Sequence, residues 1–306
     1  MCAKAMGWLF GLTSQDSAQL SCEGLLIRQM NQEEARRILA SSQDFFAKDA
    51  AIWQNTIASF PLVYEKDVRD DYSIGGEESV GFLFNLLSPG EVRVPIQWMI
   101  RGKSGATASS STVIDYFFRR INGRFQEISF ASVRGAASAA LRRLNSQLML
   151  PNALGLDPIL MERVYAIKRF PLKSESPKAN AVSRAAEICM GLEYLMHEGA
   201  TAEVLFRLSL TLAWLLESEP AKREETLMHV KSTYELRSKT VHGVRLDSKT
   251  LNKVSFRPVL ATDLLFRRAV LARLMLNAGE DRWLEVIRQS RLGFEIELDR
   301  ADWMTE

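Results

Sequence analysis

Cysteine and histidine are the scarcest chemically reactive residues of this 306-residue sequence, which contains three of each. The cysteines are Cys2, Cys22 and Cys189, an odd number placed far apart. Neither a disulfide framework nor a paired metal-ligand spacing can be read from them. His197 and His229 have no nearby cysteine or aspartate cluster, which favours a surface or helix-capping role for each over metal binding. We therefore expect a chain of the reducing cytoplasm, without a metal or another cofactor.

Long apolar runs are also missing, because charged residues interrupt every stretch that approaches the length needed to cross a membrane. The apolar run at residues 6–12 is too short to span, and polar residues end it at once. Residues 19–22 (QLSC) resemble a lipoprotein cleavage box only faintly, because Gln19 stands where an apolar residue is required. We expect neither a cleaved leader nor contact with a membrane.

A large charge of one sign is likewise absent, since the formal net charge is only +2. A protein that coats nucleic acid is usually more basic. An enzyme that meets RNA in one cleft needs only a local basic patch, so the weak net charge does not exclude it. Hydrophobic residues make up 47% of the chain and charged residues 25%, which are ordinary values for a globular protein.

The length fits two domains, and we place the boundary near residue 150, where Pro151 and Gly155 interrupt the pattern. Residues 1–150 form a predicted α+β domain of unknown role. Its elements are predicted strands at 23–30, 60–68 and 92–101, predicted helices at 31–41 and 77–87, and a small, polar loop at 102–112.

Residues 151–306 form a predicted all-α domain, so the chain is predominantly α overall. The predicted helices from residue 132 onward are 132–149, 157–169, 183–197, 201–217, 220–242 and 258–278. Pro220 and Pro258 mark two helix starts, where the missing N–H of proline costs nothing. The run at 204–216 (VLFRLSLTLAWLL) is apolar nearly all round, which predicts a helix at the centre of a bundle.

The most informative residue is Arg237, in the predicted helix 220–242. Leu227, Val230, Tyr234 and Val241 recur at helical spacing and form an apolar stripe, and at about 100° per residue Arg237 falls inside it. A permanent guanidinium charge on a core-facing stripe is costly unless it is paired or faces a wet interface.

His242 follows Arg237 by five positions, so on an unbroken helix their side chains diverge by roughly 140°. Gly243 allows the helix to end at His242. The two groups therefore need not cooperate within one chain. A second copy packed by two-fold symmetry would bring both pairs to a shared cleft.

Residues 234–243 (YELRSKTVHG) resemble the signature of HEPN domains, in particular the Apea-like HEPN group, in which an Arg is followed by a His after four to six residues. Residues 184–196 (RAAEICMGLEYLM), 206–216 and 263–274 are similar to the other bundle helices of that group, and residues 94–102 are loosely similar to its N-terminal region. The Arg-x4-His pattern alone is weak, and its place near the end of the third bundle helix strengthens it.

The resemblance implies a metal-independent endoribonuclease, in which the RNA 2′-OH attacks the adjacent phosphate. His242 would transfer protons as general base or acid, and Arg237 would hold the phosphate. Ser238 and Lys239 would contact the substrate, and Glu193 would orient Arg237. The resemblance further implies a homodimer with a composite site, RNA as partner, a toxin or antiviral defence role, and an antitoxin or other regulator.

Two other interpretations of the same residues stay open. Arg237 and His242 are also compatible with an inactive site that binds phosphate, or with a structural pair in which Arg237 bridges to Glu193 and His242 ends a helix. For Glu193, a salt-bridge or surface role competes with a role in the site. A non-catalytic module that binds nucleic acid or a protein is therefore the alternative function.

Overall fold

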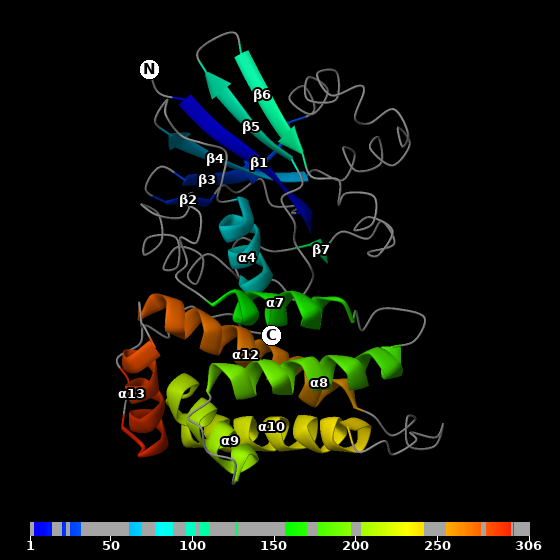
Figure 1. The fold of residues 1–306 in the computed structure, drawn as a ribbon, viewed down its shortest axis with the longest axis vertical. Coiled ribbons are helices and arrows are strands. Elements are labelled where there is room, and N and C mark those ends of the chain that lie inside the picture. The colour runs from blue at the N-terminus through cyan, green and yellow to red at the C-terminus, as the bar shows by residue number, and fades with distance from the viewer. Residues whose placement is uncertain are drawn as a thin grey trace. The chain divides into compact units, whose positions relative to one another are not determined.

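The chain is mostly helical in the part that the structure, a computed structural model, describes (Figure 1). This confirms the prediction of a predominantly α chain. It divides into two units, residues 1–84 with 92–154, and residues 85–91 with 155–306. The described residues are 3–13, 20–22, 25–31, 61–68, 77–87, 96–101, 105–110, 126–127, 157–170, 177–196, 203–241, 255–276, 280–294 and 296.

Within the described part of the first unit, seven strands form one sheet in the order β2-β3-β4-β1-β5-β6, with β7 paired to β1. β1 pairs antiparallel with β4 and β5, and in parallel with β7. The strands are β1 (Ala3–Thr13), β2 (Leu20–Cys22), β3 (Leu25–Gln29), β4 (Pro61–Val68), β5 (Ile96–Arg101), β6 (Gly105–Ser110) and β7 (Gln126–Glu127).

The predicted strands at 23–30, 60–68 and 92–101 are confirmed as β3, β4 and β5, each somewhat shorter than predicted. The predicted loop at 102–112 is wrong, because residues 105–110 form β6. β6 pairs with β5 from Arg101↔Gly105 to Ile96↔Ser110. Small polar residues have little strand propensity of their own, and cross-strand pairing overrides that weak preference.

Helix α4 (Glu77–Leu87) has the bounds that the sequence predicted. Phe82, Leu83, Phe84 and Leu86 are completely buried. Residues 85–91 belong to the second unit, so the division of the chain passes through the last turn of α4. The predicted helices at 31–41 and 132–149 and the predicted boundary near residue 150 lie outside the described residues.

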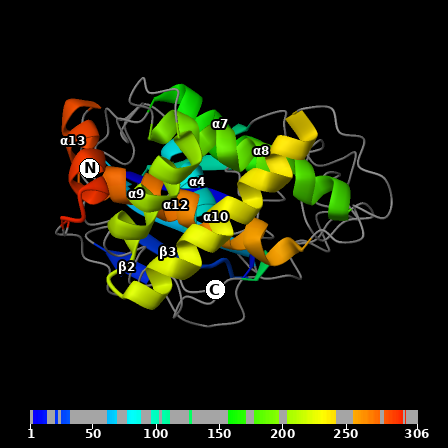
Figure 2. The same ribbon diagram turned by 90° about the horizontal axis from the view of Figure 1, so that it is seen from below.

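Six helices of the second unit are described, and α10 packs against three of them, α8, α9 and α12 (Figure 2). α7 packs on α8, and α13 packs on α9. α10 therefore carries side chains at several interfaces at once. The bounds are α7 (Pro158–Lys168), α8 (Pro177–Leu195), α9 (Val204–Leu216), α10 (Pro220–Val241), α12 (Phe256–Met275) and α13 (Glu280–Arg291).

The helix starts follow the capping rules in part. Asp157 precedes α7 and accepts a hydrogen bond from the backbone N–H of Ile159 at 2.7 Å. Pro220 begins α10 as predicted, whereas α12 begins at Phe256, two residues before Pro258. No helix was predicted where α13 lies, although Trp283, Val286 and Ile287 recur there at helical spacing and are buried.

The core of the second unit centres on α12, which buries thirteen of its twenty residues. Its Phe266 packs against Gly191 of α8, where an added Cβ would lie 2.7 Å from the ring, so glycine permits the close approach of these helices. α9, which the sequence predicts at the centre of a bundle, packs against α8, α10, α12 and α13, although its Phe206 is 61% exposed. The opposite side of α9 supplies Leu212 and Leu215 to the core.

Four charged side chains, Lys168, Arg184, Asp263 and Arg267, are buried in this core, and we call them the buried charge cluster. Arg184 Nη2 donates to Asp263 Oδ2 at 2.8 Å, and Arg267 Nε lies 3.4 Å from the same oxygen. Arg184 also donates to the carbonyl oxygen of Phe170, so the cluster joins α8 and α12 to the end of α7.

Burial alone raises the pKa of Asp263, but Arg184, Arg267 and Lys168 outweigh that effect and hold the pKa below its ordinary value. Burial lowers the pKa of Lys168 well below its ordinary value, and the neighbouring Arg267 lowers it further.

Candidate functional site

Arg237 lies on α10, on the side of the helix that also carries the core residues Val230 and Tyr234. Val230 is completely buried and Tyr234 is 9% exposed, whereas the Arg237 side chain remains 26% exposed. The guanidinium therefore lies at the edge of the apolar stripe, where the core gives way to solvent. The free-energy cost of burying the charge is lower at this position than in the core, because solvent still reaches part of the side chain.

The carboxylate of Glu193, on α8, faces this guanidinium from the neighbouring helix. Glu193 Oε1 lies 3.5 Å from Arg237 Nη2, and the side chains are 32% and 26% exposed. The Tyr234 hydroxyl donates a hydrogen bond to the same Oε1. One carboxylate oxygen thus receives both a guanidinium and a phenol. We call Cys189, Glu193, Tyr234 and Arg237 the Arg237 cluster.

On the side of the Arg237 cluster that faces the core, burial shifts the pKa values of Cys189 and Tyr234. Burial raises the pKa of the Cys189 thiol to about 12, and the charge of Glu193 adds to this effect while Arg237 opposes it. Burial also raises the pKa of Tyr234, with further contributions from its hydrogen bond to Glu193 and from that charge. Both groups therefore stay protonated near neutral pH, and Tyr234 stays a donor.

The guanidinium of Arg237 retains hydrogen-bonding capacity. Its Cζ lies 5.7 Å from the centre of the Tyr234 ring, a cation–π distance. Its Nε is buried and has no hydrogen-bond partner within the described residues, so an oxyanion cannot reach that donor, and the ion pair with Glu193 is made through Nη2. A planar guanidinium has five N–H donors, and those on Nη1 and Nη2 remain for an oxyanion such as a phosphate.

The structure brings together two of the five predicted site residues, Arg237 and Glu193. Ser238 follows Arg237 on α10 and is partly exposed. Lys239 is also part of α10, but its side chain lies outside the described residues, as does all of His242. The predicted relation between Arg237 and His242 therefore stays a prediction.

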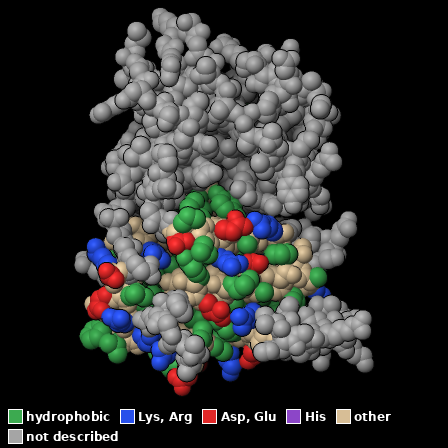
Figure 3. Space-filling view, viewed as in Figure 1, with side chains coloured by type: hydrophobic (Ala, Val, Ile, Leu, Met, Phe, Trp, Pro, Cys, Tyr) green, Lys and Arg blue, Asp and Glu red, His purple; other side chains and the backbone are tan. Residues whose placement is uncertain are grey.

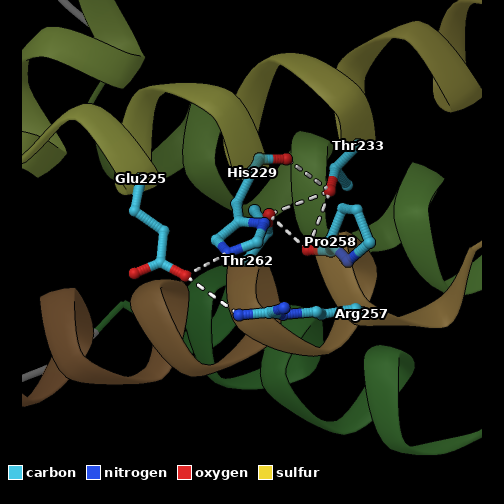
Figure 4. A network of polar contacts seen from close by, with 6 residues as sticks. All are labelled: Glu225, His229, Thr233, Arg257, Pro258 and Thr262. Atoms are coloured by element: carbon cyan, nitrogen blue, oxygen red, sulfur yellow. Dashed lines mark hydrogen bonds and ion pairs between the residues drawn. The ribbon is translucent and has the colours of Figure 1, made fainter. Parts of the chain in front are cut away.

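A second polar cluster, shown in Figure 4, lies where α10 meets the start of α12. Glu225 Oε1 lies 3.2 Å from both His229 Nε2 and Arg257 Nη2. Beside it, the hydroxyls of Thr233 and Thr262 lie 2.8 Å apart. These contacts connect the two helices with polar groups on a largely apolar interface.

A pocket of about 360 Å³ opens beside this second cluster and is lined by Ala221, Glu224, Glu225, Met228, His229 and Arg257. Two carboxylates oppose one guanidinium and one imidazole there, so the lining selects neither an anion nor a cation strongly. From the sequence, His229 is predicted to be an isolated histidine, but the structure pairs it with Glu225. The four-residue spacing of Glu225 and His229 on one helix was the available signal for their contact.

Acidic and basic side chains are interspersed over the described residues of the bundle on the face seen in Figure 3. This mixture agrees with the small net charge. Within the described ranges, no three His, Cys, Asp or Glu side chains are grouped to hold a metal ion. None of the described helices combines the length and the apolar character that a membrane crossing requires.

Comparison with models of known protein families, with curated proteins and with solved structures gave no match to this chain. The similarity to HEPN domains therefore depends on the sequence motifs alone.

Proposed function

We propose that this chain is a metal-independent endoribonuclease, with an HEPN-like helical bundle in residues 151–306 and Arg237 and His242 as its catalytic pair. The observation that carries the proposal is the state of Arg237. Its guanidinium lies at the edge of the core, pairs with Glu193 at 3.5 Å through Nη2, and has further Nη donors beside that ion pair. It also lies in the second-last turn of α10, which ends at Val241, directly before His242 in the sequence.

In the proposed reaction the RNA 2′-OH attacks the adjacent phosphorus. The 2′-O–P bond forms as the P–O5′ bond breaks, which leaves a 2′,3′-cyclic phosphate and a free 5′-OH. His242 accepts the 2′-OH proton or donates a proton to the leaving oxygen, since imidazole exchanges protons near neutral pH. Arg237 neutralises the charge that grows on the phosphate oxygens. Ser238 and Lys239 contact the RNA, and Glu193 holds Arg237.

The proposed active form is a homodimer with a composite site in the cytoplasm. Because Arg237 and His242 diverge on one helix, a second copy would supply the missing partner of each pair. The α+β domain in residues 1–150 would act as a sensor or specificity element. A toxin or antiviral role, controlled by an antitoxin or another regulator, follows from the HEPN analogy alone.

The alternative is a non-catalytic HEPN-like module that binds nucleic acid or a protein partner. The ion pair between Arg237 and Glu193 favours it, because a neutralised guanidinium is less available to a phosphate. The pair is long and partly exposed, however, so Glu193 neutralises the guanidinium only in part.

RNA cleavage by the purified chain in the presence of chelator tests the proposal. We expect His242→Ala and Arg237→Ala each to lower cleavage by about 100-fold or more, because each removes a group used in the transition state. Arg163→Ala is the matched control: Arg163 is also a partly exposed arginine, paired with Glu187 of α8 at 3.2 Å. It should cleave like the unmodified chain.

The outcomes separate the two functions. Cleavage that survives both substitutions removes the site assignment, and cleavage abolished by chelator removes the metal-free mechanism. RNA binding that depends on Arg237 without any cleavage supports the non-catalytic module. Light scattering at micromolar concentration tests the homodimer, and a monomer alone contradicts the composite site.

A further inference from the structure

Tyr234 occupies a position in the Arg237 cluster to which the proposed mechanism assigns no role. It precedes Arg237 by three residues on α10, so the two side chains project on the same side of the helix one turn apart. The ring lies under the guanidinium, and the hydroxyl reaches across to α8 to donate to Glu193 Oε1. Tyr234 therefore touches both members of the Arg237–Glu193 ion pair.

The exposure of the three side chains falls in a definite order. Glu193 and Arg237 are 32% and 26% exposed at the side chain, whereas Tyr234, taken as a whole residue, is 9% exposed and counts as buried. The phenol thus binds the carboxylate on the side that faces the core. The side of the guanidinium that faces solvent stays accessible. Because burial and Glu193 raise the pKa of Tyr234, the hydroxyl keeps its proton and remains a donor through the physiological range.

The geometry points to Tyr234 as a positioning residue, which fixes Glu193 through its hydroxyl and thereby aims the guanidinium of Arg237 at a phosphodiester oxyanion. This role rests on the proposed nuclease function for its effect on rate. A long ion pair between two partly exposed side chains does not by itself fix an orientation, because both side chains have several rotamers. The hydrogen bond from the phenol restricts the carboxylate to one orientation. The Tyr234 ring restricts the movement of the guanidinium that lies over it.

The principal variant is Tyr234→Phe, which keeps the ring and removes the hydroxyl. We expect kcat for RNA cleavage to fall about tenfold while KM changes less than about threefold, since misorientation affects the transition state more than ground-state binding. Tyr194→Phe is the matched control. Tyr194 is the next residue after Glu193 on α8, and its hydroxyl bonds to Asp157 instead. This control should leave kcat unchanged.

A double-mutant cycle tests whether Tyr234 acts through Glu193. If it does, Tyr234→Phe combined with Glu193→Ala should cleave RNA no more slowly than Glu193→Ala alone, because the hydroxyl then has no acceptor at position 193 to hold. Additive losses contradict the inference, and so does a Tyr234→Phe variant that cleaves at the normal rate. A loss of kcat matched by Tyr194→Phe would indicate a general structural effect and would also overturn it.

A measurement without RNA separates this inference from the proposed function. In nitrogen-15-labelled protein, rotation of the Arg237 guanidinium about its Nε–Cζ bond can be followed by NMR. We expect rotation to be slow in the unmodified chain and at least severalfold faster in both Tyr234→Phe and Glu193→Gln. If the chain does not cleave RNA but rotation responds in this way, the nuclease proposal fails and the positioning role stands. Unchanged rotation overturns the positioning role, whatever the activity.

Discussion

Two of the arginine–carboxylate arrangements among the described helices differ in what surrounds them. In the buried charge cluster, Asp263 is 1% exposed at the side chain and receives Arg184 at 2.8 Å and Arg267 at 3.4 Å. In the Arg237 cluster, Glu193 is 32% exposed and lies 3.5 Å from Arg237. The first arrangement is closed to solvent and joins three helices. The second is open to solvent, so an arginine–carboxylate pair joins helices in one place and lies at the surface of the core in the other.

The two arrangements also differ in how they respond to the loss of one partner. Removing one member of a buried ion pair leaves a charge without compensation in a poorly solvated place, which is strongly destabilising. Removing one member of an exposed pair leaves a charge that water can solvate, at little cost. The following predictions test whether this distinction holds, from the largest effect to the smallest.

Asp263→Asn should produce the largest effect, a loss of about 3–5 kcal/mol in the free energy of unfolding. The substitution keeps the size of the side chain but removes the carboxylate that Arg184 and Arg267 share. Denaturant titration followed by circular dichroism measures the loss. Glu225→Gln is the control, because Glu225 is also contacted by two basic groups, His229 and Arg257, but is 48% exposed.

The control variant Glu225→Gln should lose no more than about 1 kcal/mol in the free energy of unfolding. Equal losses in the two variants would show that burial does not distinguish the clusters.

Acid gives a second test of Asp263, because the pKa of its carboxyl is lower in the folded chain than in the unfolded chain. The stability from this carboxylate is present above its ordinary pKa and is lost as the pH falls below that value. The unmodified chain should therefore lose more stability on acidification than Asp263→Asn does.

The pKa of Cys189 shows how far water is excluded from the side of the Arg237 cluster that faces the core. Its pKa is raised from 9.0 to about 12 in the folded chain, so the native state holds the thiol proton more tightly than the unfolded state. The contribution of the thiol is complete below about pH 9 and is lost as the pH rises from there towards 12. Unfolding experiments at pH 7 and pH 10.5 should show a larger alkaline loss in the unmodified chain than in Cys189→Ala.

The raised pKa of Tyr234 also causes a loss of stability at alkaline pH, but Tyr234 is present in both proteins, so their difference isolates Cys189. Parallel stability curves for the two proteins would mean that water reaches the thiol. In that case the contrast with the buried charge cluster would be weaker than the structure indicates.

The fold was predictable where the local signal was strong. The bounds of α4 and the start of α10 follow from periodicity and from a proline at the first helical position. β6 was not predictable from its small polar residues, since its backbone pairs with β5 and only the tertiary structure supplies that partner. The apolar residues 6–12 lie within β1, a strand that is absent from the sequence prediction.

The candidate site could likewise be predicted from the sequence only in part. Arg237 could be found because a permanent charge within an apolar stripe conflicts with the rest of its helix. The distance to Glu193, and the bond from Tyr234 to that carboxylate, join residues about forty positions apart and require the packing of α8 on α10. Asp263 gave a comparable sequence signal, a lone carboxylate in the largely buried helix α12, but its partner Arg184 lies 79 residues away.

Glu193→Gln should have the smallest effect on stability, a change within about 1 kcal/mol. The amide oxygen can still accept the Tyr234 hydrogen bond, and Arg237 keeps its access to water. Glu187→Gln is the matched control, since Glu187 is also on α8 and pairs with the partly exposed Arg163. Both variants should unfold at nearly the same denaturant concentration as the unmodified chain. If Glu193→Gln instead loses more than about 2 kcal/mol while Glu187→Gln does not, Arg237 depends on its carboxylate as Arg184 does. The guanidinium would then be committed to the fold and would not be free to hold a phosphate.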